Sequence, residues 1–198
     1  MDENRWDGTM LEPVAEINAF MLEILRATAA AEEHSSPRLV SGLRELWREL
    51  NAPAQQRLAH CPYLLLDAGF ACRERWERPA PERGVMDGGG SHGYFASPRG
   101  VALVRRTLVF AWHLARSNRL PARVLLGMSA ECAERIAASA LRDLEALAEL
   151  APAWVVPRWE QQPVIWRQMM RAALDGQDAH LKQVQLRGVQ LLAGGAVS

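Results

Sequence analysis

Lysine is almost absent from this sequence, and neither sign of charge prevails. Lys182 is the single lysine among 23 basic residues, and 23 acidic residues balance them to a formal net charge of zero at pH 7. A neutral chain lacks the excess positive charge with which proteins coat nucleic acid non-specifically or attach to acidic membranes. The composition therefore argues against both functions for the chain as a whole.

Cysteine is also scarce, and long apolar runs are missing. Cys61, Cys72 and Cys132 are an odd number of cysteines without the spacing of a disulfide scaffold or a zinc site. The first residues are acidic and contain no apolar segment of a secretion signal. The longest uncharged apolar stretch of the central region, 107–115, is about half of a membrane span. We expect a cytoplasmic protein with no membrane partner.

Aromatic and β-branched runs are too few for a β-sandwich, and apolar residues recur instead at helical spacing. We predict an all-α fold of several helices, packed orthogonally or as a bundle. Asn51 and Ser129 are placed to cap helices. The apolar run 61–70 suits a buried helical turn better than a strand, and no internal repeat is apparent. The expected helices cover residues 11–25, 39–50, a segment from Pro53 onward, 101–120, 129–138, 141–150, 163–174 and 178–192.

The two halves of the chain differ in charge. Residues 1–100 have 11 arginines and 15 acidic residues, whereas residues 101–198 have 12 basic and 8 acidic residues. Glycine, proline and serine gather between these halves, where they disfavour a helix. We therefore predict an acidic helical region over 1–86, a connector over 87–100 and a helical domain over 101–198. The glycines do not form a phosphate-binding loop, because no strand precedes them and no Gly-Lys-Ser/Thr follows.

Residues that carry enzyme or metal chemistry are scattered. His34, His60, His92, His113 and His180 show no metal-ligand spacing. The cysteines lie mostly among apolar or small residues, which favours inert thiols. We predict no catalytic residues, no metal and no cofactor. An enzyme would require the fold to bring distant residues such as His113 and Asp67 together.

One stretch of the second half, 101–123, contains arginines and no acidic residue. Arg105, Arg116 and Arg119 lie roughly on one side of a helix, and Arg123 follows. Guanidinium groups in such a row can bind phosphates. The alternative is a solvated helix face whose long arginine stems cover the edge of the core.

The helix expected over 101–120 is apolar almost all round, so neighbouring helices or a second subunit must cover it. Leu108, Phe110 and Trp112 are its candidates for a dimer interface. Trp154 and Trp159 flank a proline-rich segment and are further candidates, because tryptophan is favoured at interfaces. These tryptophans serve equally well to close the chain's own core.

Residues 101–198 resemble the FlhD family, the D subunit of the flagellar master transcription activator. The likeness lies in three stretches, in the same order and spacing as in the family: 114–127 (LARSNRLPARVLLG), 128–148 (MSAECAERIAASALRDLEALA) followed by 155–159 (VVPRW), and 186–195 (LRGVQLLAGG). Residues 1–100 have no counterpart that we can place.

The resemblance implies an all-α homodimer that joins FlhC, a zinc-containing partner subunit, and activates transcription from promoter DNA. By this resemblance Arg119 and Arg123 match the basic stretch of the family, and Arg158 matches its aromatic-basic segment. These arginines become candidates for contact with DNA or the partner. The family's intersubunit cysteine, present in some members, aligns near Val155, so that disulfide is not expected here.

A second class of function remains open from the sequence. The acidic first half repels phosphate but suits a basic protein surface. An interaction adaptor or a secretion-associated regulator would use the same fold without binding DNA, and a fold alone does not distinguish the two.

Overall fold

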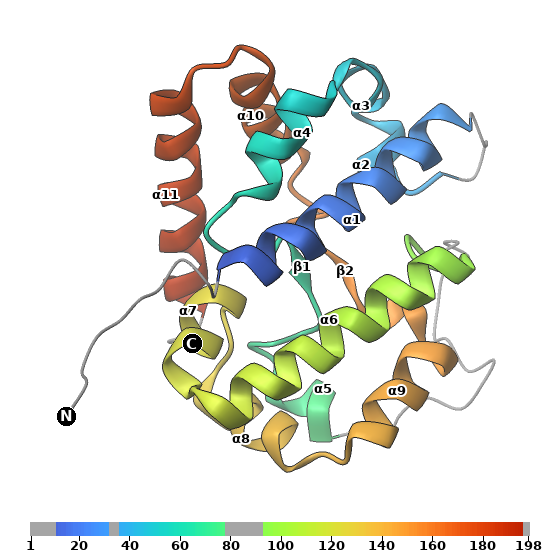
Figure 1. The fold of residues 1–198 in the computed structure, drawn as a ribbon, viewed down its shortest axis with the longest axis vertical. Coiled ribbons are helices and arrows are strands. Elements are labelled where there is room, and N and C mark those ends of the chain that lie inside the picture. Colours follow the sequence, from blue (N-terminus) through green and yellow to red (C-terminus); the bar gives the residue numbers. More distant parts are fainter. Residues whose placement is uncertain (1–10, 32–35, 78–92, 196–198) are drawn as a thin grey trace.

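The computed structural model describes residues 11–31, 36–77 and 93–195, and it confirms the all-α prediction (Figure 1). Helices make up most of the described chain, and two strands of two residues each lie between them. The elements are α1 (Leu11–Ala30), α2 (Arg38–Ser41), α3 (Arg44–Glu49), α4 (Ala52–Ala59), β1 (Leu66–Asp67), α5 (Arg73–Glu77), α6 (Pro98–Ser117), α7 (Arg119–Leu126), α8 (Ala130–Ala138), α9 (Leu141–Leu150), the 3-10 helix η2 (Pro152–Trp154), β2 (Val156–Pro157), α10 (Pro163–Leu174) and α11 (Asp178–Gly195).

The predicted caps are present. The side chain of Asn51 accepts a hydrogen bond from Ala54 N at 2.9 Å, and Ser129 accepts one from Cys132 N at 3.1 Å. A third cap, Ser97, starts α6 at Pro98 and not at residue 101. The predicted connector 87–100 is thus wrong at its end, and its residues 87–92 lie outside the described residues.

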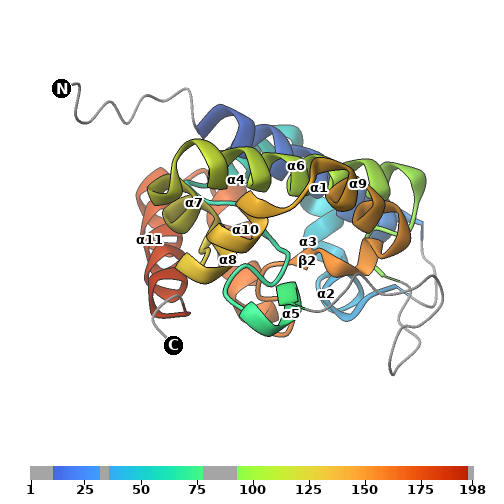
Figure 2. The same cartoon turned by 90° about the horizontal axis from the view of Figure 1, so that it is seen from below.

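The helices α1 and α6 cross the middle of the molecule in antiparallel directions (Figure 1). Two ion pairs, Glu16 with Arg106 and Glu23 with Arg99, connect the helices. From the first pair to the second, the residue number rises by seven in α1 and falls by seven in α6, as expected for antiparallel helices. Both helices lie toward one face of the molecule, whereas α5 lies toward the opposite face (Figure 2).

The segment 61–70 is not the helical turn that we predicted. It contains no helix, and several of its backbone hydrogen bonds go to distant segments: Leu64 N donates to Leu125 O at 2.8 Å. Its residues Leu66 and Asp67 form β1, which pairs antiparallel with β2 so that Leu66 lies opposite Pro157 and Asp67 opposite Val156. Apolar content alone does not separate a buried turn from a buried strand.

The order of elements occurs twice along the chain, contrary to our reading of the sequence. A 20-residue helix, three shorter helices, a two-residue strand and a further helix make up residues 11–77. The same succession makes up residues 98–174, with the 3-10 helix η2 added before the strand. We call these the first and second repeat. The strand register relates them by an approximate two-fold axis, because residue 66 faces 157 and residue 67 faces 156.

Individual residues match between the repeats at a separation of 90. Pro62 and Pro152 precede the strands, and Trp76 and Trp166 are both buried in the helices that follow. The backbone is left-handed at Gly69 (φ 71°) and also, 90 residues later, at Trp159 (φ 54°). In the long helices α1 and α6 the matching separation is 86. Buried residues of α1 at positions 14, 17, 18, 21, 22, 25 and 29 then correspond to buried residues of α6 at positions 100, 103, 104, 107, 108, 111 and 115.

Each repeat is completed by the last helix of the other. The helix α10 of the second repeat packs on α3 and α4, and α5 of the first repeat packs on α8. Arg57 of α4 donates to Ala173 O in α10 at 2.9 Å, and Arg135 of α8 donates to Trp76 O in α5 at 3.3 Å. The halves of opposite charge therefore share one hydrophobic core.

The last helix, α11, follows the second repeat and packs on α10 and α7. Its Gly188 is buried where no side chain fits, since a Cβ atom there would clash with the Tyr63 ring and lie 2.9 Å from Trp159. Gly188 thus allows α11 to approach the segments beside the two strands.

Candidate functional site

Two arginines of α6, within the acid-free stretch 101–123, form ion pairs with neighbouring helices. Arg105 pairs with Glu149 of α9, and Arg106 pairs with Glu16 of α1. The side chains are roughly half exposed, so each pair contributes about 0–1 kcal/mol to stability. These guanidinium groups link helices and are not held out toward a ligand.

Arg158 corrects one prediction. It lies in the interior with an exposed fraction of 6%, so it does not contact DNA or a partner. Its Nε donates to Leu64 O at 2.9 Å, and its Nη2 donates at 2.9 Å to both Leu66 O and Leu126 O. Burial lowers the pKa of Arg158, and the charge of Asp67 opposes that shift. The guanidinium group thus links the second repeat to two carbonyl groups of the first, and it also binds the end of α7 within its own repeat.

Three of the predicted arginines lie on successive turns where α6 ends and α7 begins. Arg116 lies over the ring of Trp112, 4.8 Å from its centroid, and Arg119 pairs with Glu134 at 3.0 Å. Arg123 is exposed one turn farther along α7. Two exposed apolar residues of α7, Leu120 and Val124, each follow one of these arginines directly. We define the α6–α7 corner as Arg116, Arg119, Leu120, Arg123 and Val124.

The predicted dimer residues serve the chain's own packing. Leu108 has an exposed fraction of 1%, so its assignment to a dimer interface is wrong. Trp112 donates to Ser139 O at 2.9 Å, and Phe110 is partly buried against the core. The apolar face of α6 is covered by α1, α7, α8 and α9, which removes the need for a second chain to shield it.

The tryptophans near the proline-rich segment also have partners within the chain. Trp154 meets Trp76 edge to face at 5.8 Å, and the guanidinium group of Arg75 lies 4.6 Å from its ring centroid. Trp159 meets Tyr63 edge to face at 5.7 Å. Both rings are partly buried against the core. Of the alternatives that the sequence left open, closure of the chain's own core accounts for their contacts.

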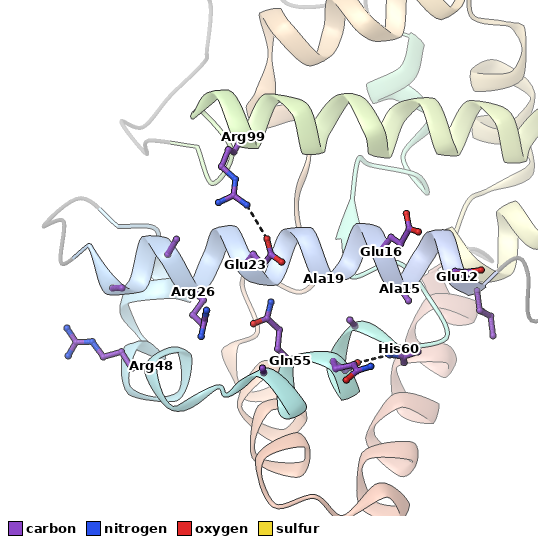
Figure 3. Close-up of a pocket in the computed structure, with 16 residues that line it drawn as sticks. Glu12, Ala15, Glu16, Ala19, Glu23, Arg26, Arg48, Gln55, His60 and Arg99 are labelled. Atoms are coloured by element: carbon purple, nitrogen blue, oxygen red, sulfur yellow. Dashed lines mark hydrogen bonds and ion pairs between the residues drawn. The ribbon is translucent and has the colours of Figure 1, made fainter.

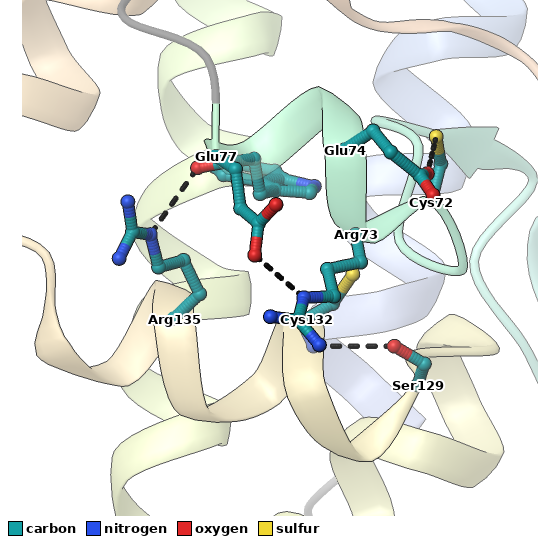
Figure 4. A network of polar contacts seen from close by, with 8 residues as sticks. Cys72, Arg73, Glu74, Glu77, Ser129, Cys132 and Arg135 are labelled. Carbon is teal, nitrogen blue, oxygen red and sulfur yellow. Dashed lines mark hydrogen bonds and ion pairs between the residues drawn. The ribbon is translucent and has the colours of Figure 1, made fainter.

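Cys61 and Cys132 lie in surroundings that disfavour a thiolate. Burial raises the pKa of Cys61 to about 12, and burial also raises the pKa of Cys132. Cys72 is exposed, with its sulfur 3.5 Å from a carboxylate oxygen of Glu74 (Figure 4). Across the ranges 11–31, 36–77 and 93–195, no three His, Cys, Asp or Glu side chains are grouped to hold a metal ion.

A groove that the sequence analysis did not identify lies along α1, against α4 (Figure 3). Its volume is about 1160 Å³. Alanines of both helices line it, and charged residues stand at its rim: Glu12, Glu16, Glu23, Arg26, Arg48 and Arg99. The nearest signal in the sequence is the run of alanines at positions 15, 19, 27 and 30 of α1. We call this feature the α1–α4 groove.

Comparison of the chain with protein-family models, with curated proteins and with solved structures gives no match. Among the described helices, none is both long enough and apolar enough to span a membrane.

Proposed function

We propose that this chain is a non-enzymatic transcriptional regulator subunit that resembles FlhD and acts on DNA together with an FlhC-like protein partner. Its two repeats take the places of the two subunits in the family's homodimer. The internal repeat, related by an approximate two-fold axis through the paired strands, is the observation that carries this proposal. It supplies the first half of the chain with a counterpart, which the resemblance alone did not.

The position of the family's intersubunit cysteine supports this arrangement. That cysteine aligns near Val155 in the second repeat, and Leu65 occupies the matching position of the first repeat, 90 residues earlier. Both side chains are buried, and Leu65 O accepts a hydrogen bond from Arg158 N at 2.8 Å beside the paired strands. The repeats thus meet at the position where the resemblance places a link between two subunits.

The proposal replaces the homodimer with a monomer. Light scattering on the purified full-length chain is expected to give the mass of one chain, 22.0 kDa, across micromolar concentrations. A stable dimer at these concentrations would contradict the idea that one chain supplies both halves.

The α6–α7 corner is the proposed contact with DNA. Reversing two charges, Arg119→Glu with Arg123→Glu, is expected to lower recovery of promoter fragments by about tenfold when the chain is cross-linked to DNA in its native cell. Each phosphate contact that the variant loses should also reduce the slope of the logarithm of the binding constant against the logarithm of salt concentration by about one. The matched control is Arg167→Glu with Arg171→Glu, two exposed arginines one turn apart on α10.

The wild-type chain and the α10 control are expected to recover the same discrete fragments. Equal recovery with the reversed α6–α7 corner would remove that surface from the proposal, and recovery of no discrete DNA by the wild type would remove DNA binding altogether.

An adaptor that binds proteins without DNA is the second candidate function. The burial of Arg158 and the ion pairs of Arg105 and Arg119 favour it, because they reduce the basic surface available to phosphates. Recovery of the same partner with and without nuclease treatment, together with no enrichment of DNA, is the outcome expected of the adaptor.

A further inference from the structure

We propose that the α1–α4 groove is a docking surface for an amphipathic helix of a protein partner, with basic side chains at one end of that helix and acidic side chains at the other. This inference deepens the partner-binding part of the proposed function and rests on it. It is independent of the α6–α7 corner and of DNA.

The charges at the rim of the groove are sorted by sign along α1. Glu12 and Glu16 stand at one end, whereas Arg26 and Arg48 stand at the other (Figure 3). Glu12 and Arg26 are 14 residues apart on one helix, which is about 21 Å at 1.5 Å per residue. A partner helix of about four turns therefore spans both ends, and its own charges must be sorted in the opposite sense.

The walls of the groove suit a helix in particular. Alanines from α1 and α4 line it, including Ala15, Ala19 and Ala59, while Gln55 and Gln56 add amide groups between the charged ends. Small side chains let a third helix come close to two packed helices, and this is the usual way in which an amphipathic helix binds a groove.

The second repeat shows what closes such a groove. Ala19 of α1 corresponds to Arg105 of α6 at the separation of 86, and Ala59 of α4 corresponds to Glu149 of α9 at the separation of 90. In the second repeat these two positions form an ion pair that bridges the two helices. In the first repeat both positions are alanine. Ala19 is partly exposed, Ala59 is buried, and both line the groove.

A second difference between the repeats acts at the basic end of the groove. The residue that corresponds to Arg26 is Trp112, whose indole nitrogen donates to Ser139 O between α8 and α9. The large ring therefore covers the end of the second repeat's helix pair. Arg26 carries a charge to the same position and lies exposed at the rim. The first repeat thus differs from the second at three positions whose counterparts bridge or cover the second repeat's helices.

Three synthetic helical peptides test the proposal. They are 18 residues long with the same alanine-leucine face; one carries lysines at one end and glutamates at the other, one carries lysines at both ends, and one carries glutamates at both. The full-length chain is expected to bind the bipolar peptide at least about tenfold more tightly than the other two, a difference of about 1.4 kcal/mol. The preference should weaken with added salt.

Charge reversal at either end should redirect this preference. Glu12→Lys with Glu16→Gln makes both ends basic, so the peptide with glutamates at both ends is expected to become the tightest ligand. Arg26→Glu with Arg48→Gln makes both ends acidic, so the peptide with lysines at both ends is expected to take that place. Neither double variant removes a contact of the α6–α7 corner.

Closing the groove is the third arm of the test. Ala19→Arg with Ala59→Glu transfers the ion pair of the second repeat and is expected to reduce binding of the bipolar peptide at least tenfold. Ala19→Arg alone, at a partly exposed position, serves if the double variant fails to fold. The matched control, Arg105→Ala with Glu149→Ala, removes the ion pair of the second repeat and should leave peptide binding unchanged.

Equal binding of the three peptides, binding of none, or full binding after closure would overturn the docking surface. None of these outcomes affects recovery of promoter DNA, which depends on the α6–α7 corner. Conversely, the peptides can bind as expected in a chain that recovers no DNA, so the two proposals fail separately.

Discussion

Gly69 and Trp159 adopt the same left-handed backbone conformation at the same place in the two repeats, just after the paired strands. Their φ angles are 71° and 54°. Glycine adopts this conformation without strain, whereas for a residue with a Cβ atom it costs about 1–2 kcal/mol. Trp159 remains in it while its ring packs against Tyr63. The chain therefore keeps the turn in both repeats, although only one of them has the residue that favours it.

Replacement of that glycine should weaken the fold. Gly69→Ala is expected to lower the free energy of unfolding by about 1–2 kcal/mol, because alanine is strained at a positive φ and its Cβ would crowd the side chain of Arg75. Urea denaturation measures this. The control is Gly194→Ala in α11, where a Cβ meets nothing within 4 Å, and no loss of stability is expected there.

Docking of the last helix depends on Gly188. Gly188→Ala is expected to cost about 1–3 kcal/mol, because the added methyl group collides with Tyr63 in a packed interior. Thermal denaturation followed by circular dichroism checks the change. A variant as stable as the wild type would mean that α11 does not pack as closely as described.

The buried guanidinium group of Arg158 should contribute far more to stability than its exposed counterparts. Arg158→Ala leaves three buried carbonyl oxygens without their donor, and we expect a loss of about 3–5 kcal/mol. Arg105→Ala breaks an exposed ion pair and should cost less than about 1 kcal/mol. Comparable losses in urea denaturation would argue against an interior position for Arg158.

Burial of Cys61 predicts a dependence of stability on alkaline pH. Its pKa is raised from 9.0 to about 12 in the folded chain, so above pH 9 the unfolded chain releases a proton that the folded chain retains. The stabilising effect is therefore complete below pH 9 and is lost as pH rises toward 12, with a slope of at most about 1.4 kcal/mol per pH unit.

Cys61→Ala should reduce this slope between pH 9 and 10. The slope that remains is expected from Cys132, Tyr63 and Tyr94, because burial raises the pKa of each of them as well. The exposed Cys72→Ala serves as control and should keep the wild-type slope. If Cys61→Ala and the wild type lose stability equally over this range, the thiol of Cys61 does not carry the effect.

Helical spacing and capping residues predicted most helices, because both signals are local. The caps at Asn51 and Ser129 are examples, since each bonds a backbone nitrogen three residues ahead. The strand at Leu66 was missed because it depends on a partner 90 residues away. The repeat was missed because it is preserved in burial and backbone conformation more than in residue identity.

The candidate sites were less predictable than the helices. Arg158 and Arg123 are equivalent in a sequence, yet one is enclosed by carbonyl groups and the other is exposed, and only the tertiary packing decides which. The α1–α4 groove had no motif at all. The side chains of Ala19 and Ala59 are too small to bridge α1 and α4. This is recognised only by comparison with Arg105 and Glu149, which occupy the matching positions of the second repeat and form an ion pair.

The exchange of α5 and α10 between the repeats has a consequence for synthesis on the ribosome. Trp47 meets Trp166 with ring centroids 5.7 Å apart, and more than a hundred residues separate the two in the chain. As the chain emerges, Trp47 has no native indole neighbour until α10 has been translated. We therefore expect ordering of the amino-terminal half to depend on completion of the carboxy-terminal half, because α3 and α4 lack their native neighbour α10 until then.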